Sequence, residues 1–267
     1  MSLVYVRPLA IGSERCEPAM KETMASVFPH GFDSQRFDRL LERHVVVAVF
    51  ALSDWRPWAA GVFDLIDVRE HERVQRQRRA EHRQDLALAY ALHRLVLARA
   101  LDMPAARVPL GRDPHGRPVV EGMAVETSLS HADGRVAVAI GLHGPVGVDI
   151  EPAARADGMQ EIAGRVCHGD EHARIAACRD TEQGRALLDL WVRKEAFLKA
   201  AGVGLAREMD TFALPQGGAT LLHPGQTAEV SVERLDLGSD VVCALARKRG
   251  VPYVAGWVRP TGTGGGA

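Results

Sequence analysis

Two acidic side chains are placed by a strand pattern so that they could bind one metal ion together. Residues 147–151 read Gly-Val-Asp-Ile-Glu and follow Val146. Alternate side chains of a strand point to opposite faces, so the valines and the isoleucine face one way while Asp149 and Glu151 share the other face. Carboxylate oxygens suit Mg²⁺, which commonly binds one or two carboxylates together with substrate phosphate.

A helical pattern further along the chain adds a third carboxylate. In residues 191–199, Trp191, Glu195 and Lys199 recur every four residues and form one stripe. Strand and helix together would make a hard-cation site suited to phosphate chemistry. The plainer alternative is an edge strand with two solvated acids and a surface helix with an ordinary Glu195–Lys199 pair.

Lysine is rare in this chain and occurs twice in that helical segment. The lysines are Lys21, Lys194, Lys199 and Lys248, whereas the other basic residues are arginines. Lysine offers a compact ammonium whose pKa can be lowered for proton transfer, which arginine does not. The bias therefore indicates chemical roles for Lys199 and Lys194.

The elements that would position these residues follow from hydrophobic periodicity and turn signals. Strands are predicted at 3–6, 45–51, 59–66, 128–130, 135–141, 146–151, 210–214, 228–235, 241–246 and 254–258. The sequence Ala132-Asp133-Gly134 predicts a hairpin turn between the strands at 128–130 and 135–141. Helices are predicted at 13–27, 33–43, 69–101, 160–178 and 181–201, the last ended by Gly202 and Gly204. Strands and long helices do not alternate strictly, so the predicted fold class is α+β.

Composition places the chain among globular proteins that bury a sizeable core. Of 267 residues, 46% are apolar and 25% charged, and the formal net charge of -1 gives no reason to expect nucleic-acid or anionic-membrane binding. The first residues lack the layout of a secretion signal, and the apolar run 45–52 is too short to span a bilayer. The four scattered cysteines favour a reducing cytoplasm over zinc or disulfides.

Four motifs together resemble one enzyme family. The strand 147–151, the helix 191–199, the Ser130-His131 pair and the Gly116-Arg117-Pro118 turn look like the signature of 4′-phosphopantetheinyl transferases. The match is to the larger, surfactin-synthetase-activating type. The motifs occur in the family's order and at comparable spacing, over roughly residues 70–205.

The resemblance implies an activity and an architecture. Such enzymes transfer the 4′-phosphopantetheine group of coenzyme A to a serine of an apo acyl or peptidyl carrier protein and release adenosine 3′,5′-bisphosphate. It implies two similar α+β subdomains, related by a pseudo-twofold axis, with the active site between them. We expect subdomains at 1–143 and 144–259, a flexible tail at 260–267, and a monomer, because both halves of the site lie on one chain.

The resemblance also implies how the acidic residues and one lysine act. Asp149, Glu151 and Glu195 correspond to the family's metal-binding acids and would hold Mg²⁺, with Mn²⁺ as an alternative. Glu195 is the candidate base for the serine hydroxyl, and Asp149 is a candidate catalytic residue. Lys199 corresponds to the lysine beside the departing phosphate of coenzyme A.

The remaining candidates would bind coenzyme A. Lys194 is expected to contact phosphate, Ser130 and His131 would hold phosphate oxygens, and the backbone of the turn at Gly116, Arg117 and Pro118 would read the adenine edge. Trp191 is expected to pack and so position the carboxylate.

Two further residues resemble family elements. Arg83, in a His-Arg pair, would contact the 3′-phosphate of coenzyme A, although Gln84 follows where the family usually has threonine. Glu171 resembles an element near the region where the carrier protein docks, and is the weakest candidate.

Two other functions use similar residues. A Mg²⁺-dependent phosphohydrolase or nuclease would also cluster acids, but it leaves the Ser-His and Gly-Arg-Pro motifs unexplained. A non-catalytic module that binds coenzyme A or a carrier protein would not need the acids and Lys199 together.

Overall fold

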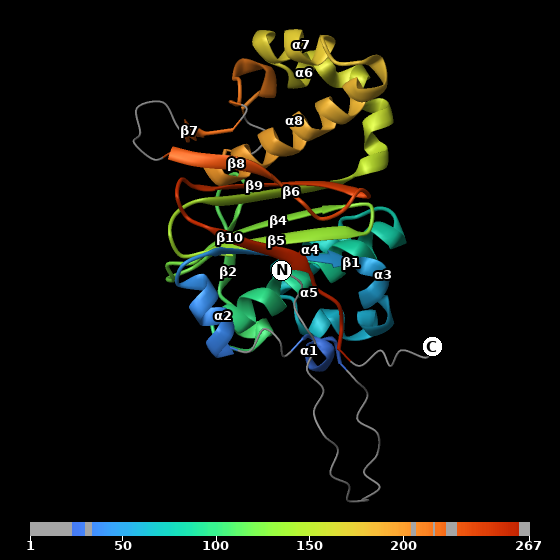
Figure 1. Cartoon of the computed structure of the whole chain (residues 1–267). Coiled ribbons are helices and arrows are strands. Elements are labelled where there is room, and N and C mark those ends of the chain that lie inside the picture. The colour runs from blue at the N-terminus through green and yellow to red at the C-terminus, as the bar shows by residue number, and fades with distance from the viewer. Residues whose placement is uncertain (1–22, 30–33, 204–206, 216, 223–228, 262–267) are drawn as a thin grey trace, which may run out of the picture.

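Two four-stranded sheets form the centre of the molecule, and one long helix covers the outer face of each (Figure 1). The structure, a computed structural model, describes residues 23–29, 34–203, 207–215, 217–222 and 229–261. The predicted strand at 3–6, the first part of the helix at 13–27 and Gly204 lie outside these residues. The fold class is α+β, as predicted.

The first sheet has the strand order β10-β1-β5-β4. Its strands are β1 (Val45–Ala51), β4 (Glu126–Ala132), β5 (Arg135–Gly141) and β10 (Tyr253–Trp257). β10 runs parallel to β1, and the other pairs are antiparallel. The predicted hairpin between β4 and β5 is confirmed, with Asp133 and Gly134 at positive φ in the turn.

The second sheet is antiparallel throughout, in the order β6-β9-β8-β7. Its strands are β6 (Val146–Pro152), β7 (Ala219–Leu221), β8 (Glu229–Leu235) and β9 (Val241–Lys248). A separate ribbon pairs β2 (Leu110–Arg112) with β3 (Pro118–Val120). It carries the Gly116-Arg117-Pro118 turn.

Helices cover the outer faces of the sheets. They are α1 (Met24–Val27), α2 (Ser34–Leu41), α3 (Leu52–Trp55), α4 (Val68–Gln75), α5 (Ala80–Ala100), α6 (Ala163–Val166), α7 (Gly169–Ala176) and α8 (Asp180–Ala201). Shorter 3₁₀ helices are η1 (Arg56–Asp64), η2 (Ala105–Arg107), η3 (Ala153–Ile162) and η5 (Met209–Thr211). None of the helices within the described ranges has the length and apolar composition that crossing a bilayer requires.

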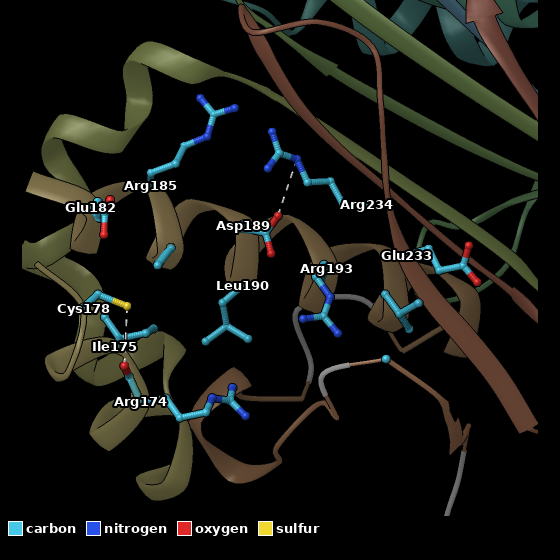
Figure 2. Close-up of a pocket in the computed structure, with 13 residues that line it drawn as sticks. Arg174, Ile175, Cys178, Glu182, Arg185, Asp189, Leu190, Arg193, Glu233 and Arg234 are labelled. Carbon is cyan, nitrogen blue, oxygen red and sulfur yellow. Dashed lines mark hydrogen bonds and ion pairs between the residues drawn. The ribbon is translucent and has the colours of Figure 1, made fainter.

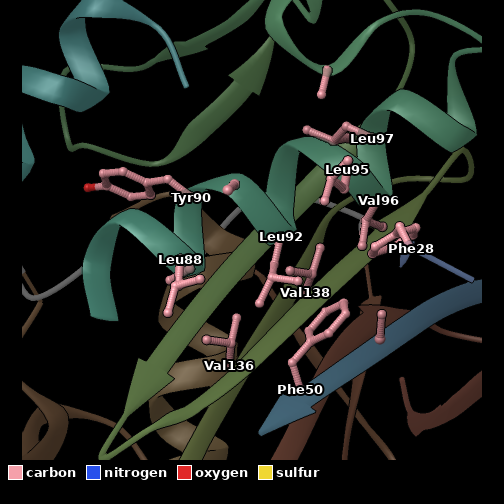
Figure 3. Packing of buried hydrophobic residues seen from close by; sticks show 14 of the residues in the cluster. Phe28, Phe50, Leu88, Tyr90, Leu92, Leu95, Val96, Leu97, Val136 and Val138 are labelled. Carbon is pink, nitrogen blue, oxygen red and sulfur yellow. The ribbon is translucent and has the colours of Figure 1, made fainter. Parts of the chain in front are cut away.

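Three apolar clusters hold these layers together. Between the sheets, Val47 and Val49 of β1 meet Val148 and Ile150 of β6. Outside the first sheet, α5 packs Leu88, Leu92 and Val96 toward Phe50, Val136 and Val138 (Figure 3). Outside the second sheet, α8 packs against β8 and β9. The result is a helix–sheet–sheet–helix arrangement.

The C-terminal strand corrects the predicted division of the chain. β10, which was expected to belong to the subdomain 144–259, pairs with β1 in the first sheet. The sheets therefore do not separate at residue 143 alone, because the chain returns to the first sheet at its end. The pseudo-twofold relation stays a prediction.

Several predicted elements differ in type. The predicted strand at 59–66 is the helix η1, where Pro57 lies in the first turn and favours helical φ. The predicted helix at 69–101 is broken between α4 and α5, and that at 160–178 is divided among η3, α6 and α7. The predicted strand at 210–214 is a 3₁₀ turn followed by irregular chain.

Candidate active site

The acidic strand β6 lies directly under α8, as the site requires. Val148 and Ile150 are buried between the sheets, and Asp149 and Glu151 lie on the opposite face, as predicted. Both acids are buried rather than solvated. β6 is an edge strand of its sheet, and it meets edge strand β4 of the other sheet through a hydrogen bond from the Val148 amide to Ser128 Oγ, at 3.1 Å.

Gly147 permits the close approach of β6 to α8. A Cβ atom added at this glycine would lie 2.0 Å from the carbonyl oxygen of Ala196 and 2.5 Å from the amide nitrogen of Ala200. These are backbone atoms, so no side-chain rotation could relieve the clash. The absence of a side chain at Gly147 therefore brings the acids of β6 next to Glu195 and Lys199.

We expect Gly147→Ala to destabilise the protein by about 3 kcal/mol, because strand and helix would have to move apart. Chemical denaturation should show the loss, and turnover should fall with it. Gly164→Ala is the matched control, since an added Cβ there meets nothing within 4 Å. A Gly147→Ala protein as stable as this control would contradict the proposed role of the close contact.

Asp149 is the centre of the polar network. Its Oδ1 accepts hydrogen bonds from Ser130 Oγ and from Lys199 Nζ, both at 2.7 Å. Lys199 Nζ also donates to the carbonyl of Val148 at 3.1 Å. Lys199 thus pairs with Asp149 rather than with Glu195, and the plainer alternative of a solvated Glu195–Lys199 pair is wrong.

Glu151 is held by an arginine that the sequence analysis did not single out. Arg155 Nη1 contacts Glu151 Oε1, and its guanidinium carbon lies 5.0 Å from the centre of the Trp191 ring. Trp191 is partly buried against the apolar cluster beneath α8. Trp191 therefore packs against Arg155, and Arg155 in turn pairs with Glu151 four residues before it.

Burial and mutual repulsion make two of the three acids weak. Burial, and secondly the charge of Asp149, raise the pKa of Glu151 to about 7 and the pKa of Glu195 to about 6. Arg155 and Lys199 oppose both shifts. Raised carboxyl pKa values in a polar site are typical of groups that await a cation or a proton.

The raised pKa of Glu151 predicts how stability depends on pH in the presence of a chelator. A carboxyl whose pKa is higher in the folded state favours folding most below about pH 4.5. Its favourable effect on the free energy of unfolding is lost as pH rises through 7. We therefore expect Glu151→Gln to exceed the wild type in unfolding free energy by roughly 2 kcal/mol at pH 8, and the gap to narrow at pH 5. Glu161→Gln, at an exposed acid, is the control. A gap that does not change with pH would refute the shift.

One buried oxygen atom without a hydrogen-bond partner indicates that a metal ion could bind here. Asp149 Oδ2 is buried and makes no hydrogen bond within the described part of the chain. In the same ranges, however, no group of three or more His, Cys, Asp or Glu residues is gathered as a ready metal cluster. The free oxygen and the weak acids beside it suit a hard cation that takes further ligands from substrate phosphate. The three-carboxylate metal site stays a prediction.

A cavity of about 210 Å³ opens beside this network and gathers most of the other candidates. It is lined by Tyr90, Arg112, His115, Gly116, Arg117, Pro118, Ser128, Leu129, His131, Lys199 and Gly202. The Gly-Arg-Pro turn, His131 and Lys199 thus meet in one place, although they come from three distant parts of the sequence. Burial, and secondly Lys199, lower the pKa of His131.

Lys194 is not in this site, which corrects the prediction that it contacts phosphate. Its ammonium is fully buried and lies 2.5 Å from Glu171 Oε2. It also donates to the carbonyls of Val166, Met209 and Phe212, at 2.7–2.8 Å. Burial lowers the pKa of Lys194, while Glu171 opposes the shift.

Glu171 is likewise structural rather than a surface element for docking. It is fully buried, and its second oxygen accepts the amide of Leu214 at 2.8 Å. The Lys194–Glu171 pair therefore joins α7, α8 and the segment around η5.

Arg83 also lies apart from the cavity. Its Nη1 donates to the carbonyls of Gln77, at 2.9 Å, and Arg78, at 3.2 Å, in the turn between α4 and α5. It lines a separate cavity of about 470 Å³ between η1, α4 and α5. A larger cavity, of about 840 Å³, lies on another flank of α8 among arginines and acids of α7, α8 and β8 (Figure 2) and contains none of the predicted residues.

Comparison with known proteins finds similarity over the part of the chain that contains this site. The model of the 4′-phosphopantetheinyl transferase superfamily matches residues 145–246, the part that contains β6 and α8. This part of the chain is therefore similar to that superfamily. The match begins one residue before the acidic strand and includes Asp149, Glu151, Glu195 and Lys199.

Individual relatives are named 4′-phosphopantetheinyl transferases. A 4′-phosphopantetheinyl transferase of Bacillus subtilis is 29% identical over 60% of this chain and 72% of its own length. The transferase Sfp of Bacillus subtilis strain 168 is 28% identical over 62% of this chain and 70% of its own. The transferase gsp of Aneurinibacillus migulanus is 30% identical over 47% of this chain, and the chain spans about half of its length.

Proposed function

We propose that this chain transfers the 4′-phosphopantetheine group of coenzyme A to a serine hydroxyl of an apo carrier protein and releases adenosine 3′,5′-bisphosphate. The observation that carries the proposal is the position of Lys199. Its ammonium bonds Asp149 in the acidic network and also lines the cavity formed by the Gly116–Pro118 turn and His131. One cation thus joins the acids to a cavity suited to a nucleotide.

The reaction needs a base, charge neutralisation and a stabilised leaving group. The serine oxygen attacks the phosphorus that bears pantetheine, and a new P–O bond forms while the bond to the bridging oxygen of the pyrophosphate breaks. Glu195 takes the hydroxyl proton, because a carboxylate with a pKa of about 6 is largely ionised near neutrality and still basic enough to accept it. Lys199 neutralises the phosphate that departs with the nucleotide.

We infer that Mg²⁺ is the cofactor and that Asp149, with Glu151 and Glu195, would hold it. When bound, the ion neutralises pyrophosphate charge. Asp149 offers Oδ2 without giving up its bonds to Ser130 and Lys199, which use Oδ1. Glu151 can join only if Arg155 releases it. Mn²⁺, with similar preference for oxygen ligands, would be accepted in place of Mg²⁺.

The same proposal includes the two substrates, the oligomeric state and the cellular compartment. The donor is coenzyme A, and the acceptor is an acyl or peptidyl carrier protein. Acids, lysine and cavity all belong to one chain, which supports a monomer. Three cysteines in the described ranges are free thiols, which suits the reducing cytoplasm.

Intact-mass measurement tests this function. The protein, an apo carrier protein, coenzyme A and Mg²⁺ are incubated together, and the carrier should gain the mass of one phosphopantetheine. A carrier variant whose acceptor serine is alanine should gain nothing. Breakdown of coenzyme A with an unchanged carrier would instead favour a phosphohydrolase, and tight binding with no reaction would favour a non-catalytic module.

A further inference from the structure

We propose that Arg155 is the counter-ion that a divalent cation must displace from Glu151, and that this competition sets how tightly the acidic site binds the cation. The inference rests on the proposed function and adds a positioning residue, which acts through Glu151, to the three acids. Three observations carry it: the pairing of the acids, the fixed backbone around Arg155, and the aromatic ring beside its guanidinium.

Arg155 neutralises a carboxylate that water screens poorly. Arg155 Nη1 contacts Glu151 Oε1, and the side chain of Glu151 is only 11% exposed. Lys199 pairs with Asp149 instead, at 2.7 Å. Burial raises the pKa of both Glu151 and Glu195, and Arg155 opposes the rise in each. The charge of Arg155 therefore acts on two of the three acids, and a cation that takes Glu151 competes with it directly.

The backbone at Arg155 is held on both sides. Before it, the amide of Ala153 donates to the carbonyl of Asp240 at 2.9 Å. After it, the carbonyl of Ala156 lies so close to α8 that a Cβ atom added at Gly184 would be 2.4 Å from its oxygen. A glycine at this position of α8 thus lets η3 pack tightly on the helix. Only the side chain of Arg155, and not its backbone, is free to leave the acid.

The ring of Trp191 gives the guanidinium a second partner. The guanidinium carbon of Arg155 lies 5.0 Å from the ring centre, and the Arg155 side chain is 40% exposed. An aromatic face attracts a cation without fixing its hydrogen bonds, so the guanidinium can turn toward water and stay on the ring. Lys199, in contrast, is held by a carboxylate and a backbone carbonyl. Of these two cations, Arg155 is the one that can exchange.

The sign of a change in metal affinity distinguishes competition from simple support. If Arg155 only kept Glu151 in shape, its removal would weaken metal binding, whereas removal of a competitor strengthens it. The whole chain, first treated with a chelator, is titrated with Mn²⁺ alone, and free Mn²⁺ is measured by electron paramagnetic resonance. We expect Arg155→Ala to lower the Kd for Mn²⁺ by about 10-fold.

Two arginine variants serve as controls. Arg155→Lys keeps the charge, and its Kd should stay within about 3-fold of the wild type. Arg179→Ala removes an arginine that pairs with Glu182 at the start of α8, and it should change the Kd by less than about 2-fold. If Arg155→Ala does not fold, Arg155→Gln takes its place in the titration. Unchanged or weaker Mn²⁺ binding in the folded variant would overturn the proposal.

A double variant and a transfer assay complete the test. In the Glu151→Gln background, Arg155→Ala should change the Kd by less than about 3-fold, because the acid for which the two cations compete is gone. An equal gain with and without Glu151 would show a general effect of charge and overturn the proposal. Transfer by the wild type, together with an unchanged Kd in Arg155→Ala, would reject the role of Arg155 alone. Absence of transfer by the wild type would reject the proposed function.

Discussion

Glu195→Gln is expected to lower kcat by about 10²- to 10⁴-fold while the Kd for coenzyme A, measured without a divalent ion, changes by less than about 3-fold. The amide keeps the shape of the side chain but cannot accept the serine proton. Burial and Asp149 keep the pKa of Glu195 near 6, so the wild-type group is ionised and basic at neutral pH. The cavity beside the Gly116–Pro118 turn, where coenzyme A is proposed to bind, is lined by Lys199 and not by Glu195. The effect should therefore fall on the chemical step.

Single-turnover transfer and calorimetric binding separate these two quantities. Glu182→Gln is the matched control, because Glu182 lies on the same helix but beside the larger cavity on another flank. Equal losses in kcat and in coenzyme A affinity for Glu195→Gln would show that Glu195 serves binding, and the role of base would then pass to another group.

Lys194→Ala is expected to lower the free energy of unfolding by about 3–5 kcal/mol, because it leaves the buried carboxylate of Glu171 without its cation. Lys199→Ala should have the opposite profile. Lys199 is partly exposed, so its loss should cost less stability than the loss of Lys194, but it removes the cation that joins Asp149 to the cavity beside the Gly116–Pro118 turn. Of the two lysines on α8, Lys194 would thus mainly affect stability and Lys199 would mainly affect function.

Chemical denaturation and coenzyme A titration, both at low temperature, check this contrast. Replacing the pair together, as Lys194→Met with Glu171→Leu, should restore much of the stability, because no unpaired buried charge remains. A stable Lys194→Ala protein with weakened coenzyme A binding would mean that Lys194 contacts ligand after all.

The local pattern of the sequence was sufficient where a residue's role depends on its own element. The alternation in β6, the turn at Asp133 and Gly134, and the end of α8 at Gly202 are confirmed, because strand pleat, positive φ and the left-handed C-cap are local properties. These elements position Asp149, Ser130 and Lys199, so the centre of the candidate site was predictable.

Contacts between distant segments were not predictable in the same way. The bias against lysine marked Lys194 correctly as unusual, but the cause is its buried partner Glu171, which no spacing reveals. β10 pairs with β1, which lies far away in the sequence, and the alternating pattern of a strand does not predict which other strand it pairs with. Arg155 stands four residues after Glu151, a spacing that could have drawn attention to it.

The proposed metal site is tested most directly by the position of a divalent ion in crystals grown with Mn²⁺ and coenzyme A, located by its anomalous scattering. We predict one ion at about 2.0–2.3 Å from Asp149 Oδ2, between β6 and α8, in contact with pyrophosphate oxygens and with Glu195 or Glu151 nearby. An ion bound elsewhere, with Asp149 still bonded only to Ser130 and Lys199, would contradict the claim that phosphate chemistry occurs where these two elements meet.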